Sequence, residues 1–144
     1  MKTINWKYAI IAGIIGTVFF DIAGLFFTGK WWDIPSILGE KTGLGLVYGV
    51  LVHYSNGVFL AILFAGIAPS LWGPKWLRPI VFMICQTIVV VWLFMFPLLG
   101  AGIAGTKLSP MMPLITIFRH LAFAVPLIFL IHASIPQVKT IKVK

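Results

Sequence analysis

Long apolar runs separated by short polar segments dominate the chain. Four runs, at about residues 8–27, 44–68, 77–99 and 112–133, are each long enough to form a membrane-spanning helix of about 20 residues. The segments between them are rich in glycine, proline and tryptophan, which are typical of turns and of membrane–water interfaces. The pattern predicts an all-α membrane protein, a four-helix transmembrane bundle that forms a single domain over residues 1–144.

The composition supports lipid as the solvent of this chain. Of the 144 residues 60% are hydrophobic and only 10% are charged, whereas soluble domains carry about 25% charged residues. The net charge of +8 comes from lysines and arginines that stand singly between apolar runs and do not gather into one basic patch. We therefore expect a lipid bilayer, and no nucleic acid, as the main partner.

The positive charges also predict an orientation. Seven lysines and arginines belong to the N-terminus, the connection between the second and third runs, and the C-terminal tail, whereas three belong to the other two connections. Cytoplasmic loops of membrane proteins carry the excess of positive charge. The expectation is a multi-pass protein with both termini in the cytoplasm. The first group comprises Lys2, Lys7, Lys75, Arg78, Lys139, Lys142 and Lys144, and the second Lys30, Lys41 and Lys107.

A weak internal repeat suggests that the bundle consists of two similar helical hairpins. His53 precedes Pro69 by sixteen residues, and His120 precedes Pro136 by the same number. Such parallel repeats are related by an axis along the membrane normal.

Four ionisable residues within the apolar runs are expected at one depth. With a rise of about 1.5 Å per residue, Asp21, His53, Arg119 and His120 all fall about 10–13 Å from the outer ends of their helices. Charged groups are costly in hydrocarbon and usually face the interior of a bundle. The sequence therefore predicts a polar layer in the outer half of the membrane, with an ion pair between Asp21 and Arg119.

Small residues surround one of the two histidines of this layer. A four-residue spacing places them on one face of the second helix. Such a face allows another helix, or a flat cofactor, to approach closely. The face comprises Gly45, Gly49, His53, Gly57, Ala61 and Ala65.

One hypothesis is that the bundle binds haem b for electron transfer with a quinone pool. His53 and His120 would ligate the iron from opposite sides, as side chains of facing helices do in bundle cores. Gly49 and Gly57 would admit the porphyrin, and Arg119 would pair with a propionate.

The same residues allow other interpretations. His53, His120 and Asp21 together form a ligand set suited to a transition metal ion. The chain is also compatible with a cofactor-free, non-catalytic subunit of a larger membrane complex or a homo-oligomer. A small transporter, with the polar layer as its proton or substrate site, is a further class. No catalytic residue is identifiable, and whether the protein is an enzyme stays open.

Several short segments resemble a family of small four-helix prokaryotic integral membrane proteins of unknown function. The matching pieces run over residues 32–39, 73–78 and 97–102, together with His53 followed by Asn56-Gly57, and His120. The resemblance implies the four-helix architecture, a prokaryotic cytoplasmic (inner) membrane, and the two histidines as a matched pair. It implies no reaction or substrate, and Asp21 and Arg119 lie outside its pattern.

Overall fold

The computed structural model describes residues 4–134, and all its regular secondary structure is helical. Within these residues the helices are α1 (Trp6–Thr28), α2 (Asp33–Thr42), α3 (Gly45–Ile67), α4 (Leu77–Gln86), α5 (Phe96–Leu98) and α6 (Met112–Ser134). A 3₁₀ turn, η1 (Ala68–Ser70), continues α3, and a π-helical segment, η2 (Thr87–Met95), joins α4 to α5. A second 3₁₀ turn, η3 (Ile103–Gly105), lies in the loop before α6.

The four predicted membrane spans are confirmed as helices of sufficient length and hydropathy. They cover Trp6–Thr28, Gly45–Ser70, Leu77–Leu98 and Met112–Ile131. Local sequence features set the ends of α1. The Asn5 side chain caps its start by accepting a hydrogen bond from the backbone N–H of Tyr8. Gly29 ends the helix in the left-handed conformation. The chain is thus a multi-pass membrane protein by the length and composition of its helices.

Helix α2 was not predicted, because it lies in the connection between the first two apolar runs and the sequence pattern indicated only four helices. Its backbone packs directly on the beginning of α3, and only glycine permits this distance. A Cβ atom on Gly49 would overlap the carbonyl oxygen of Pro35, and one on Gly39 would overlap the backbone of Gly45. Helix α2 therefore covers one end of the bundle and does not extend into solvent as a loop.

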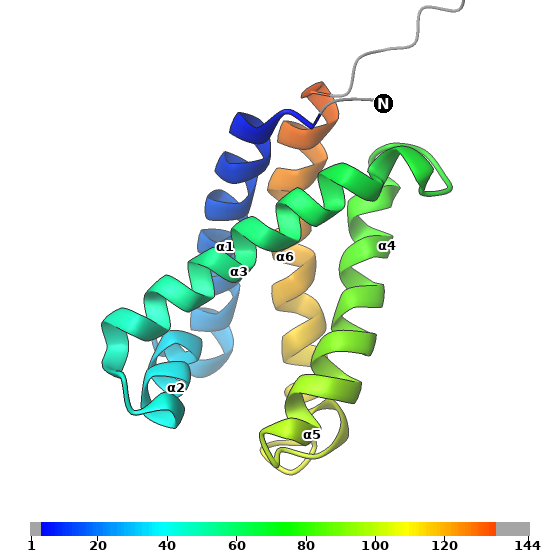
Figure 1. Ribbon diagram of the computed structural model, residues 1–144. Coiled ribbons are helices and arrows are strands. Elements are labelled where there is room, and N and C mark those ends of the chain that lie inside the picture. The colour runs from blue at the N-terminus through cyan, green and yellow to red at the C-terminus, as the bar shows by residue number, and fades with distance from the viewer. Residues whose placement is uncertain (1–3, 135–144) are drawn as a thin grey trace, which may run out of the picture.

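The long helices form a row in which α1 and α6 are central. Helix α3 packs on α1, α4 packs on α6, and α3 crosses the bundle at a steep angle (Figure 1). Near their connection, α3 and α4 contribute Phe64 and Phe82, whose ring centroids lie 5.4 Å apart, and away from it they diverge (Figure 1). The main apolar core lies at this end and comprises Ala12, Ala61, Phe64, Ala68, Phe82, Met83, Phe123, Ala124, Leu127 and Ile131.

Among the described residues, the two predicted groups of lysines and arginines lie at opposite ends of the bundle. One end of the bundle contains the start of α1, the α3–α4 connection and the end of α6 (Figure 1). The opposite end contains α2 and α5. Lys2, Lys139, Lys142 and Lys144 lie outside the described residues, as does Pro136 of the suggested repeat. The cytoplasmic location of the termini stays a prediction.

We expect Gly13→Ala to destabilise the protein by about 1–3 kcal/mol, the usual cost of overpacking a well-packed core. A Cβ atom at Gly13 would come within 2.8 Å of the carbonyl oxygen of Gly57, and backbone cannot move aside as a side chain can. Thermal unfolding in mild detergent measures the effect. The matched control is Gly66→Ala, where the nearest atom is 3.6 Å away and we expect no loss. Equal melting temperatures for the two variants would contradict the close α1–α3 contact.

Candidate functional site

A buried carboxylate and an imidazole form a hydrogen-bonded pair between α1 and α3. His53 Nε2 lies 2.9 Å from Asp21 Oδ1, and the Tyr54 hydroxyl donates to the other carboxylate oxygen at 3.3 Å. Asp21 is only 1% exposed. The pair lies within two membrane-spanning helices, so bulk water does not compete for these hydrogen bonds.

The guanidinium of Arg119 pairs with a different acid from the one expected. Its Nη1 and Nη2 donate to Asp33 Oδ2 and Oδ1, each at 2.7 Å, in a bidentate ion pair. The predicted Asp21–Arg119 pair is therefore wrong. The physical reason is that α2 folds back onto the bundle and brings a carboxylate to the buried cation, which leaves Asp21 to His53.

Helix α1 makes room for this ion pair. A Cβ atom on Gly24 would overlap the guanidinium of Arg119, so the glycine provides the space that the cation occupies. Burial alone would raise the pKa of the Asp33 carboxyl, but the hydrogen bonds and charge of Arg119, with the N–H of Ile34, outweigh it and lower the pKa below its ordinary value of 3.8. Asp33 is therefore ionised at neutral pH.

The ring of Phe20 contacts three of the four ionisable residues of the polar layer. The Arg119 guanidinium carbon lies 4.4 Å from the ring centroid, a cation–π geometry. The ring centroid also lies 5.5 Å from that of His53 and 5.0 Å from that of His120. One phenylalanine thus contacts both imidazoles and the buried cation, and the predicted layer does form in space.

His120 is held by α6 itself. Its Nδ1 lies 2.7 Å from the carbonyl oxygen of Thr116, and because a carbonyl can only accept, Nδ1 carries the proton. The Thr116 hydroxyl in turn accepts from Trp92 Nε1 at 2.8 Å, and Trp92 belongs to the π-helical segment η2. His120 therefore presents Nε2 away from its own helix backbone.

The glycines expected to admit a flat cofactor are in contact with helices. Gly49 packs against the backbone of Pro35 in α2, and Gly57 packs against Thr17 of α1. The side chain of Phe123 lies next to Gly57 as well.

The predicted metal ligands come together only in part. Asp21 and His53 are bonded to each other, whereas His120 bonds to Thr116. Within residues 4–134, no group of three histidine, cysteine or acidic side chains is placed to hold a metal ion.

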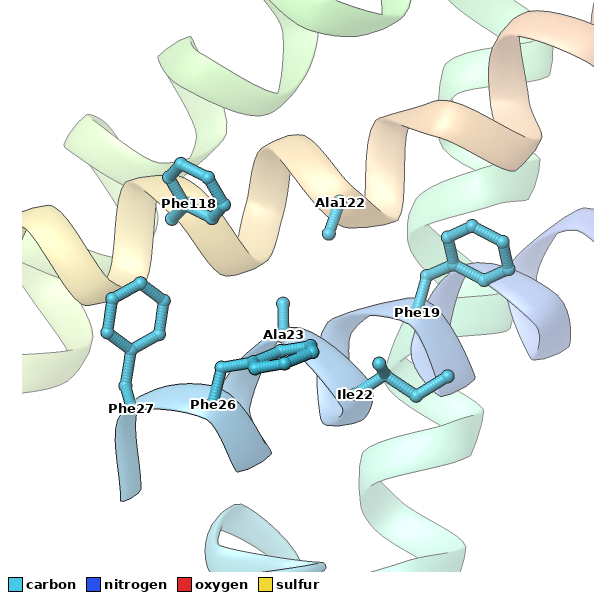
Figure 2. A pocket seen from close by; sticks show the side chains of 7 residues that line it. All are labelled: Phe19, Ile22, Ala23, Phe26, Phe27, Phe118 and Ala122. Carbon is cyan, nitrogen blue, oxygen red and sulfur yellow. The ribbon is translucent and has the colours of Figure 1, made fainter. Parts of the chain in front are cut away.

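A separate apolar hollow of about 260 Å³ lies between α1 and α6 (Figure 2). All its lining side chains are apolar, so it suits a hydrocarbon chain and not a charged ligand. Its lining residues are Phe19, Ile22, Ala23, Phe26, Phe27, Phe118 and Ala122.

Three residues of the site were not recognised from the sequence. Asp33 was not considered because it lies in the connection after the first apolar run, although it is one of only three acidic residues and Arg119 required a carboxylate partner. For Tyr54, the only indication in the sequence was its position directly after His53. Phe20 stood among many phenylalanines, so nothing in the sequence singled it out.

Comparisons of this chain with protein-family models, with curated proteins and with solved structures find no match. The site must therefore be interpreted from its own geometry.

We expect Asp33→Asn to destabilise the protein by about 3–5 kcal/mol, because it leaves the Arg119 charge buried without a counter-charge. Thermal unfolding in detergent at neutral pH measures this loss. Glu40→Gln is the matched control, since it neutralises the other, exposed acid of α2 and should leave stability unchanged. A melting temperature that is the same for both variants would show that the ion pair contributes little to stability.

Proposed function

We propose that the protein transports protons across the membrane, with Asp21 and His53 as the proton-binding pair. The observation that carries this proposal is the 2.9 Å hydrogen bond between these two titratable groups inside membrane-spanning helices. Ionisable residues within membranes commonly mark proton relays or substrate paths. Histidine is the side chain whose ordinary pKa lies closest to physiological pH.

The division of charges in the layer supports this assignment. The fixed cation, Arg119, is neutralised by Asp33, so Asp21 has a partner that can itself gain and lose a proton. A pair of this kind can hold a proton, as carboxylate with imidazolium, or release it, which leaves carboxylate with neutral imidazole. In both forms the Tyr54 hydroxyl can donate to the second carboxylate oxygen.

The location of this activity follows from the charge distribution of the chain. We place both termini in the cytoplasm, because the positive-inside rule assigns the end with Lys7, Lys75 and Arg78 to that side. The prokaryotic cytoplasmic membrane is what the family resemblance implies. The polar layer then lies nearer the external face, below α2.

Proton flux in proteoliposomes tests the proposal. Purified protein in vesicles that contain a pH-sensitive dye should acidify or alkalinise the lumen when a membrane potential is imposed. We expect Asp21→Asn to reduce the flux to that of protein-free vesicles, because the amide cannot exchange the proton. His53→Gln should do the same, and Tyr54→Phe should slow the flux by weakening the hydrogen bonding of the carboxylate.

The matched control is Tyr48→Phe, which removes a tyrosine hydroxyl from the same helix without touching the pair, and should leave the flux unchanged. A wild-type protein without flux above protein-free vesicles would overturn the proposal. So would a flux that persists in folded Asp21→Asn protein.

Haem binding for electron transfer is a second candidate, favoured by one observation. His120 donates through Nδ1 to a backbone carbonyl, which leaves Nε2 with its lone pair, as in histidines that ligate metals. A haem between His53 and His120 would have to replace the contacts that Phe20 makes with both rings and the bond of His53 to Asp21.

An absorption spectrum of protein purified from haem-replete cells, oxidised and then reduced with dithionite, tests this candidate. A b-type haem held by both histidines predicts a Soret band that disappears in His53→Ala and in His120→Ala. Folded protein without a Soret band would exclude haem and leave proton transfer as the function of the layer.

A further inference from the structure

Two polar side chains stand on a face of α3 that otherwise meets lipid. Ser55 and Asn56 are both exposed, although they lie within the span Gly45–Ser70. Asn56 is eleven residues from the start of this span, or about 16 Å along the helix, which places it near the middle of the hydrocarbon layer. Lipid chains offer no hydrogen bonds, so an amide exposed there is unfavourable by several kcal/mol.

Neither side chain finds a partner among residues 4–134. The hydroxyls of Thr17, Thr87 and Thr116 each donate to the carbonyl oxygen four residues earlier, at 2.7–2.9 Å. Ser55 and Asn56 make no such bond within the part of the chain that the structure describes. Residues 4–134 therefore leave one amide and one hydroxyl without a hydrogen-bond partner.

The surroundings of these two residues form a continuous helix face. With a turn of 3.6 residues, Tyr48, Leu51, Ser55, Phe59 and Gly66 lie on the side of α3 opposite to its contact with α1. Asn56 borders this face, and Gly66 provides a point of close approach. The face carries no charge and is exposed over its whole length.

We propose that this α3 face binds the same face of a second copy of the chain, with Asn56 hydrogen-bonded across the interface. A carboxamide both donates and accepts, so two copies related by a two-fold axis satisfy each other without any further residue type. A face without charges requires no complementary partner of opposite sign, which also favours self-association. Interhelical hydrogen bonds between polar side chains are an established source of helix association in membranes.

Cross-linking in native membranes tests the geometry. In a Cys85→Ser background, Phe59→Cys places a thiol on the α3 face, and Val89→Cys places one on the exposed side of the α4–η2 helix as the matched control. We expect a cross-linked product of twice the monomer mass for Phe59→Cys and none for Val89→Cys. Equal cross-linking at both positions, monomer only, or a product with a different protein would overturn the proposal.

The dimer dissociation constant in detergent or lipid tests the role of the amide. We expect Asn56→Leu to raise it about 3- to 20-fold, as expected for the loss of one interhelical hydrogen bond in a membrane, while Asn56→Gln should restore most of the association. Leu51→Ala, a change on the same face that leaves the amide in place, is the control for lost contact area. Because Asn56 is exposed and makes no hydrogen bond within residues 4–134, folding of the monomer should not change, and a constant unaffected by Asn56→Leu would overturn the proposal.

Discussion

The structure depends on one constraint, namely that a guanidinium cannot remain unpaired in hydrocarbon. Arg119 is only 3% exposed and lies within a membrane-spanning helix. Its partner, Asp33, comes from a helix outside the spans, so the ion pair fastens α2 to the centre of the bundle. The space for this contact comes from a glycine, since any larger residue at Gly24 would collide with the guanidinium. The ion pair thus determines the position of α2, and it requires glycine at position 24 of α1.

The neutralisation of Arg119 determines what the remainder of the polar layer can do. Had Asp21 paired with the permanent cation, its carboxylate would have been fixed in the charged form. Instead it bonds to His53, which can carry or release a proton, and to the Tyr54 hydroxyl. Phe20 packs between these groups through contacts with both imidazoles and the guanidinium. The layer therefore contains two separate pairs: the permanent ion pair of Arg119 with Asp33, and the pair of Asp21 with His53. The second pair is the basis of the proposed proton transfer.

The arrangement of the long helices leaves different surfaces for lipid and for protein. Helices α1 and α6 are the most buried spans, whereas α3 and α4 diverge and expose most of their length. Along α4 the exposed surface is almost wholly apolar and suits lipid. Along α3 it includes Ser55 and Asn56 near mid-membrane, where lipid cannot satisfy an amide. The same physical rule that pairs Arg119 inside the bundle therefore calls for a second copy outside it.

The four membrane-spanning helices, and the common level of the ionisable residues within them, could be predicted from the sequence. Both follow from local quantities, the length of an apolar run and the rise of a helix, and the four spans agree with residues 8–27, 44–68, 77–99 and 112–133 to within about two residues. Tertiary structure alone decided which charges meet. Depth does not specify the direction in which a side chain points, and the pairing of Arg119 with Asp33 joins residues that are 86 positions apart through a helix hidden in an apparent loop.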